Sequence, residues 1–220
     1  MLFRSLVDRH AAGMPLGYTT SEFATLRFSP SGKRLFLGVA PIQPAKDTSR
    51  VEMDLVKLDV WHYQDDYLQT VQLYNLSRDL QRNYQAYFDL EMNRLVSLAT
   101  PEMPQVLISR DGDGEIFYGL ADSGYRKESQ WTGGVRRDLY EINVETGKRT
   151  RIAQGLSAVL GANNVSPDGH SLVWYDLKKR QYVLWNGDRI REISRGIKFR
   201  SEEHTSELQS RQYLVCRLLL

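Results

Sequence analysis

The chain has 220 residues, of which 41% are hydrophobic, and its formal net charge is +2 at pH 7. Charges of both signs are interspersed along it without a long like-charge block, so neither a nucleic-acid partner nor an anionic membrane is indicated. The single cysteine, Cys216, excludes a disulfide framework and a cysteine zinc site, and no apolar run approaches the roughly twenty residues of a membrane-spanning helix.

The two ends of the chain differ from the rest. Residues 200–220 read RSEEHTSELQSRQYLVCRLLL and contain no Gly, Pro or Trp. Reverse translation of this stretch, and of MLFRS at residues 1–5, resembles a common short-read sequencing adapter. We therefore expect residues 1–5 and 200–220 to be adapter-derived and exclude them from fold reasoning. A natural amphipathic tail is the alternative, and it requires both ends to match the adapter by coincidence.

The first clear element is a β-hairpin over residues 26–40, LRFSPSGKRLFLGVA. A Ser-Pro-Ser-Gly turn separates two runs of alternating apolar residues. Pro30 presets one backbone angle of that turn and Gly32 supplies a positive φ. Residues 65–83, DDYLQTVQLYNLSRDLQRN, then predict an insertion that forms either a helical turn or a long strand, because periodicity alone does not decide between them.

The same hairpin design returns further along the chain. Residues 106–121 form a degenerate copy whose turn is Asp111-Gly112-Asp113-Gly114, and residues 138–155 predict two strands around a Glu-Thr-Gly turn. In residues 163–190, the turn Ser166-Pro167-Asp168-Gly169 precedes the strands SLVWY and QYVLW, which the charged DLKKR joins. The chain is therefore predicted to repeat a short antiparallel unit.

Such repetition favours an all-β fold, an incomplete β-propeller of about three blades, each an antiparallel four-stranded meander. Residues 6–199 would form this partial propeller domain, followed by the non-native tail. The intervals between Gly32, Gly114 and Gly169 exceed the roughly forty to fifty residues of compact propeller repeats, so insertions are expected between strands. An antiparallel β-sandwich is the alternative.

Specific blocks of sequence indicate a family, which the spacing of the turns alone does not. Together they resemble the amino-terminal propeller of bacterial (Bacteroidetes-like) prolyl-oligopeptidase-family serine peptidases, in the same order over nearly all of residues 11–195. The most specific block is residues 58–69, LDVWHYQDDYLQ. The other blocks include AAGMPLGYTTSEFATLRFSPSGKRLFLGVAPI, GYRKESQWTGGVRRDLYEINVETGK and SPDGHSLVWYD.

The resemblance implies a non-catalytic part of a dipeptidyl-peptidase-like or prolyl-oligopeptidase-like enzyme. In that family the propeller gates peptide substrates to an α/β-hydrolase domain, which carries the catalytic residues. The Gly-x-Ser-x-Gly nucleophile elbow of such a domain does not occur in this sequence, so we expect no catalytic residue here and no activity from the chain alone. The parent would be periplasmic or secreted. A stand-alone envelope propeller that binds proteins is the alternative.

Two motifs suggest chemistry of their own. Asp111–Glu115, DGDGE, places carboxylates at alternating positions as calcium loops do, but Ile116 occupies the position where such a loop needs glycine. A polar hairpin turn is therefore favoured, and no metal or cofactor is expected. His62 lies beside Asp65 and Asp66, but we place it in an alternating strand and assign it structural hydrogen bonding, because no nucleophile accompanies it.

Aromatic residues are the remaining candidates for contact with a peptide. Blade packing is the default role of every Trp and of Tyr63, Tyr84, Tyr125 and Tyr175. The stretch YRKESQW lies between predicted strands and carries two cations. We therefore expect the substrate contacts to include Tyr125, Arg126, Lys127 and Trp131.

Overall fold

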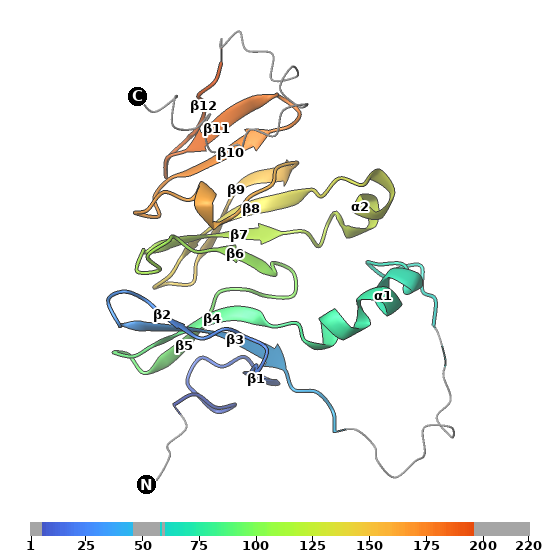
Figure 1. The fold of residues 1–220 in the computed structure, drawn as a ribbon, viewed down its shortest axis with the longest axis vertical. Helices are drawn as coiled ribbons and strands as arrows, with labels where there is room; N and C mark the ends of the chain where they lie inside the picture. The colour runs from blue at the N-terminus through green and yellow to red at the C-terminus, as the bar shows by residue number, and fades with distance from the viewer. Residues whose placement is uncertain (1–5, 46–57, 59, 196–220) are drawn as a thin grey trace, which may run out of the picture.

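The computed structural model describes residues 6–45, 58 and 60–195. The expected adapter-derived ends, residues 1–5 and 200–220, lie outside the described residues. Three antiparallel sheets follow one another along the chain and are stacked along the long axis of the molecule (Figure 1). We refer to them in chain order as sheets A, B and C.

Sheet A has a split first strand. β1 (Tyr18–Thr20) pairs with the end of β3 (Arg34–Pro41), and β2 (Arg27–Phe28) pairs with its start, both antiparallel. The other edge of β3 pairs with β4 (Tyr84–Asp89), which pairs with β5 (Arg94–Ser97). Since β1 and β2 share one edge of β3, the sheet is a meander with four strand positions.

Sheets B and C repeat the meander. Sheet B comprises β6 (Gln105–Leu107), β7 (Ile116–Ala121), β8 (Arg137–Asn143) and β9 (Arg149–Leu156), paired in that order. Sheet C comprises β10 (Leu172–Asp176), β11 (Gln181–Trp185) and β12 (Ile190–Glu192). An isolated bridge between Val165 and Leu172 marks the place of its first strand, after the short 3-10 helix η2 (Ala162–Asn164).

The helices interrupt the same connection in two sheets. α1 (Gln69–Leu80) lies between the second and third strands of sheet A, and α2 (Arg126–Thr132) lies between the second and third strands of sheet B. In sheet C the equivalent connection is a short turn. Insertions therefore explain the long repeat intervals, as the sequence predicted. No helix in the described part of the chain is long and apolar enough to cross a membrane.

The repeated turn has the same geometry in all three sheets. Its first residue, a serine, accepts a hydrogen bond through its carbonyl from the amide of a glycine three positions later, at 2.9, 3.0 and 2.9 Å for Ser29, Ser109 and Ser166. The glycines are Gly32, Gly112 and Gly169, with φ of 74°, 72° and 80°. The sequence predicted Gly114 as the turn glycine of sheet B. This prediction is wrong by two residues, because Asp113 and Gly114 follow the turn and lead into β7.

The core consists of side chains between the sheets and below sheet A. Residues from neighbouring sheets fill the two seams, with Phe36 and Phe117 between sheets A and B, and Leu120 and Trp174 between sheets B and C. The far face of sheet A packs against Val7 and Met14 of the N-terminal segment, with Tyr18 of β1 in the same cluster. Because each sheet is one consecutive stretch of chain and sheet B is covered on both faces, the molecule is an incomplete β-propeller and not a two-layer sandwich.

Candidate functional site

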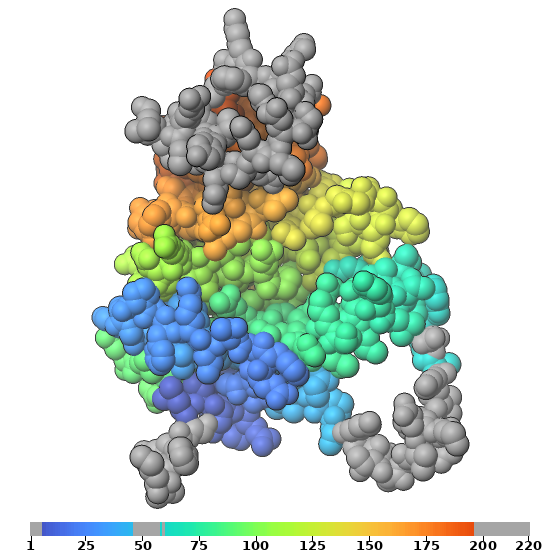
Figure 2. Space-filling view, in the orientation of Figure 1, coloured from blue at the N-terminus to red at the C-terminus, as the bar shows by residue number. Residues whose placement is uncertain are grey.

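Both helical insertions lie at the same end of the sheets, which we call the rim end (Figure 1). The repeated Ser-x-x-Gly turns lie at the opposite end of the second strands, the turn end. The insertion of sheet A includes α1 and the residues before it. We call residues 60–68 the strap. In Figure 2 this segment lies against the segment that carries α2. Segments from two neighbouring blades therefore form one surface.

The insertion of sheet A contributes little to the core. No residue of α1 is buried, and Tyr74 is 87% exposed. The other large apolar side chains exposed in the strap and α1 are Val60, Trp61, Tyr63, Leu68, Leu73, Leu76 and Leu80. A helix of this length gains its stability mainly from packing an apolar face, so α1 depends on the contacts that hold its ends.

α2 is held at both of its ends. The chain leaves the helix through Gly133, which has a φ of 66° in the left-handed region that favours glycine. At the start, the Tyr125 hydroxyl donates to Asp138 Oδ1 of β8 at 2.7 Å. This hydrogen bond to the carboxylate raises the pKa of Tyr125, since it stabilises the protonated hydroxyl.

Arg126 joins the two insertions. Its guanidinium donates to Asp122 Oδ1 at 2.9 Å, to Asp66 Oδ2 of the strap at 3.0 Å and to the Pro101 carbonyl at 2.7 Å. Its carbon Cζ lies 5.9 Å from the ring centre of Tyr67, and the side chain is only 13% exposed. Burial alone would lower the pKa of Arg126, but the two carboxylates outweigh that effect and raise it.

Two more residues of α2 contact the strap. Together with Arg126 they form a polar seam between the two insertions. Lys127 Nζ donates to the Tyr63 carbonyl at 3.1 Å. Gln130 accepts from the Leu68 amide at 2.9 Å and donates to the Asp66 carbonyl at 2.9 Å. The described contacts between the strap and α2 are thus hydrogen bonds, one ion pair and the cation–π contact of Arg126 with Tyr67, and most of the hydrogen bonds are open to solvent.

The four residues predicted to contact substrate all lie on α2 or at its start, but they differ in availability. Trp131 is 76% exposed, and no hydrogen bond to its side chain is present in the described part of the chain. Tyr125, Arg126 and Lys127 hydrogen-bond within the chain, as described above. The blade-packing default holds for Trp174 and Tyr84, which are buried, and is wrong for Trp61, Tyr63 and Trp131, which are exposed.

His62 does not lie in a strand, contrary to the sequence prediction. It occupies irregular chain at the start of the strap, where its Nδ1 accepts a hydrogen bond from the Gln64 amide at 3.3 Å and its ring lies 5.0 Å from that of Tyr63. The alternation of residues 58–64 misled the prediction, because no neighbouring strand pairs with this segment in the described structure.

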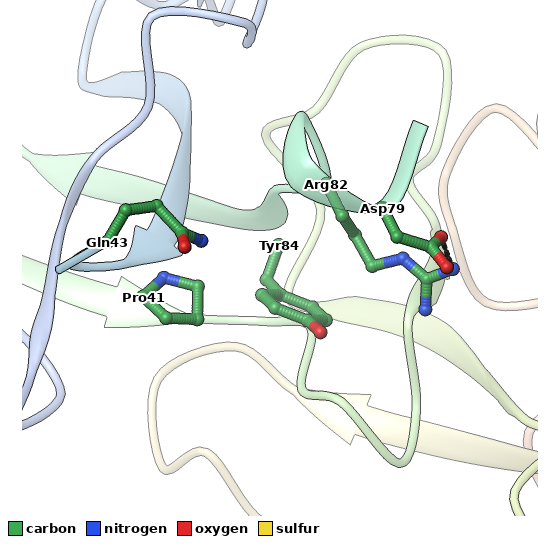
Figure 3. A pocket seen from close by; sticks show the side chains of 5 residues that line it. All are labelled: Pro41, Gln43, Asp79, Arg82 and Tyr84. Carbon is green, nitrogen blue, oxygen red and sulfur yellow. Dashed lines mark hydrogen bonds and ion pairs between the residues drawn. The ribbon is translucent and has the colours of Figure 1, made fainter. Parts of the chain in front are cut away.

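Two hollows lie at the foot of α1. The first, of about 230 Å³, is lined by Pro41, Gln43, Asp79, Arg82 and Tyr84, and Arg82 forms an ion pair with Asp79 at its edge (Figure 3). The second, of about 250 Å³, lies between sheets A and B. Its lining residues are Ala24, Thr25, Leu37, Gly38, Asn83, Gln85 and Pro104.

The acidic motif Asp111–Glu115 connects β6 to β7 at the turn end, as a hairpin connection, in agreement with the favoured prediction. Asp113 accepts hydrogen bonds from the Ser31 amide at 2.9 Å and the Ser31 hydroxyl at 2.6 Å. Its carboxylate therefore joins the turns of sheets A and B. Among the described residues, no group of three or more His, Cys, Asp or Glu side chains is arranged to hold a metal ion.

No local pattern in the sequence indicated the contacts between the strap and α2, those of Asp66 and Gln130 included, because the partners are at least sixty positions apart. The sequence does contain one signal for the second hollow. Gly38 interrupts an otherwise apolar strand, and a glycine inside a strand marks a bulge or a close approach to it.

Comparisons with known proteins identify no family. No family model and no curated protein matches the chain. Among solved structures, a protein of Agrobacterium tumefaciens assigned as TolB is similar with a TM-score of 0.34 at 13% identity, over 77% of this chain and 48% of that one. TolB from Acinetobacter baumannii gives 0.33 at 12% identity, over 77% and 40%. Hydrazine synthase of Kuenenia stuttgartiensis gives 0.33 at 12%, over 74% and 39%. The chain thus spans less than half of each, and the propeller assignment rests on its own sheets.

Proposed function

We propose that residues 6–199 are the propeller part of a periplasmic or secreted prolyl-oligopeptidase-like serine peptidase, with residues 1–5 and 200–220 adapter-derived. In this proposal the rim holds peptide substrates for an α/β-hydrolase domain that another part of the parent protein supplies. The blocks of sequence quoted above support the family. The lack of a Gly-x-Ser-x-Gly string in the sequence supports a binding role for this part.

One observation carries the assignment of the rim as the peptide-contact surface. Exposed aromatic rings on insertions of two blades are brought together by the polar seam of Arg126, Lys127 and Gln130. Aromatic side chains supply large contact areas to a peptide at a small entropic cost. Trp131 is proposed as the direct contact, while Tyr125, Arg126 and Lys127 position the surface around it.

The proposal is tested with the full 220-residue chain and fluorescein-labelled peptides that contain Ala-Pro, by fluorescence anisotropy. Trp131→Ala is expected to weaken binding at least tenfold, as truncation of an exposed aromatic anchor does. Phe28→Ala is the matched control, because Phe28 is a similarly exposed ring at the turn end. Equal binding by both variants and the unchanged chain would refute the proposed surface.

The enzyme assignment has its own test. Incubated with proline- and alanine-linked chromogenic dipeptides, the purified chain is expected to show no turnover, since it lacks the nucleophile elbow. Turnover that survives repurification and is abolished by a serine-directed inhibitor would contradict this. The gene downstream separates the alternatives: Gly-x-Ser-x-Gly followed by Asp and His favours the peptidase, and a stop codon after the last blade favours a stand-alone protein-binding propeller.

A further inference from the structure

The seam between sheets A and B is packed differently at its two ends. Toward the turn end it is filled by rings, and the centre of the Phe36 ring lies 6.2 Å from the centres of both Tyr87 and Phe117. Two residues further along each second strand, on the same faces, stand Gly38 and Gly119. The two second strands therefore contribute no side chain of their own to this part of the seam, nearer the rim end.

The space above the two glycines is used in different ways. A Cβ atom on Gly119 would lie 2.1 Å from Met103 Sδ, so the methionine side chain fills that side. A Cβ atom on Gly38 would lie 2.5 Å from Ala24 Cβ and 2.6 Å from Asn83 Oδ1. Gly38 is not among the residues with positive φ, so it is the space, and not the backbone conformation, that requires glycine here.

What remains above Gly38 is the second hollow of about 250 Å³. Gln85 stands opposite Gly38 in the strand register, and Asn83, directly before β4, places its side chain against Gly38 as well. The two side-chain amides therefore flank the hollow, which Pro104 closes from the side of sheet B. Its volume lies below the roughly 300 Å³ at which pockets for drug-sized ligands begin, so it suits a ligand of one or two residues.

The lining defines the chemistry of that ligand. None of the seven lining residues carries a charge at neutral pH. Asn83 Nδ2 makes one long hydrogen bond, of 3.4 Å to the Gln81 carbonyl, and no hydrogen bond of the Gln85 side chain is present among the described residues. The Gln85 amide offers two donors and an acceptor, and the Asn83 amide offers its second donor and an acceptor. Such a pair complements a neutral group with an N–H and a C=O side by side.

We propose that this hollow binds a main-chain amide of a peptide, with Asn83 and Gln85 as its hydrogen-bonding residues. The identification of the ligand as a peptide rests on the proposed function of the rim. The hollow opens at the rim end, where the connection from Pro101 to Pro104 links it to the seam of Arg126. A peptide held by the aromatic residues of the rim would then form hydrogen bonds through a main-chain amide at the hollow.

The test uses the full 220-residue chain and N-acetylalanine N-methylamide, a probe with two amides and no aromatic or charged group, by saturation-transfer NMR. Replacing one hydrogen-bonding side chain is expected to weaken the affinity for a small ligand about three- to tenfold. Gln85→Met, which keeps the side-chain length, and Asn83→Leu should each show this loss. Gln43→Met in the first hollow is the matched control and should leave probe binding unchanged.

A second measurement needs no variant. N-acetylsarcosine dimethylamide, which has the carbonyls of the probe but no N–H, should bind at least threefold more weakly to the unchanged chain. Equal binding of the two compounds, no saturable binding of either, or an unaltered affinity in both folded variants would overturn the proposal, with circular dichroism as the check on folding.

The two proposals fail separately. Trp131→Ala should leave the small probe unaffected. If the probe binds as expected while Trp131→Ala does not weaken the labelled peptides, the proposed rim surface is wrong and the hollow stands. If Trp131→Ala weakens the peptides and the hollow variants do not affect the probe, the reverse holds.

Discussion

At the scale of single residues, Asp113 shows how the turns of neighbouring blades are joined. Burial raises the pKa of its carboxyl, but the hydrogen bonds from Ser29 and Ser31 and the charge of Arg34 outweigh this and hold the pKa below its ordinary value. Arg34 Nη1 also donates to the Gly114 carbonyl at 2.7 Å. The ionised carboxylate therefore stabilises the contact between the turns of sheets A and B.

Asp113→Ala is expected to lower the thermal midpoint of the chain at pH 7 by a few degrees. Hydrogen bonds to a partly exposed carboxylate contribute about 1 kcal/mol, which solvent screening reduces. Because the folded pKa is depressed, the contribution is present above the unfolded pKa of about 4 and is lost as the pH falls through the lower folded pKa.

The difference between Asp113→Ala and the unchanged chain should therefore be full at pH 6 to 7 and shrink toward pH 3, as followed by differential scanning fluorimetry. Asp111→Ala is the control, since no side-chain hydrogen bond of Asp111 is present among the described residues. A difference of the same size at pH 3 and pH 7 would contradict the role of the charge.

At the scale of elements, the sequence predicted the strands well and the insertions poorly. The hairpin of β2 and β3, the pair β8 and β9 and the pair β10 and β11 are confirmed, because Pro and Gly turns and alternating apolar residues fix such elements locally. The insertion around α1 stayed undecided between helix and strand, and α2 was placed only as a segment between strands. Their structures depend on the contacts between Arg126 and Asp66, which no local pattern reveals.

The strap and α1 are expected to be the least stable part of the described fold. Polar contacts attach them to the rest of the chain, and no side chain of α1 is buried. Arg126→Ala should speed hydrogen exchange of the amides of residues 62–68 at least tenfold, while those of β3 and β4 keep their protection. Arg126→Lys should do the same in part, since an ammonium group cannot reach three oxygen acceptors in the same geometry.

The control for this exchange measurement is Arg136→Ala. Arg136 follows α2 and is ion-paired with Glu128 of that helix, 3.1 Å away; it makes no contact with the strap in the described structure. Exchange in residues 62–68 that is equally fast in both variants would show that α2 as a whole, and not the Arg126 seam, protects the strap.

At the scale of the whole molecule, the two outer sheets differ in what covers them. The far face of sheet A packs against the N-terminal segment. On the far face of sheet C, Val173 stands opposite Leu184 and Tyr175 opposite Tyr182, with the two tyrosine rings 5.1 Å apart, and no other strand of the described chain packs on them. An apolar sheet face of this kind is where another blade packs in a propeller.

We therefore expect the chain to associate through sheet C in a concentration-dependent way. A few hundred Å² of apolar surface at about 25 cal/mol per Å² corresponds to several kcal/mol, comparable to the stability of a typical domain. In sedimentation velocity, Leu184→Lys should reduce association, and Val159→Lys, at an exposed position outside the sheets, should not. A monomer with a sharp two-state melt at all concentrations would contradict this expectation.

The shared position of the two insertions has a consequence for how such a molecule can vary. α1 and α2 both replace the connection between a second and a third strand, and sheet C keeps its register with only a short turn there. Since the ends of β3 and β4 pair up to Val39 and Tyr84, segments of very different length can be exchanged at this point without altering the sheet. The rim end is thus a permissive graft position, where recognition segments can diversify while the Ser-x-x-Gly turns at the other end preserve the blade.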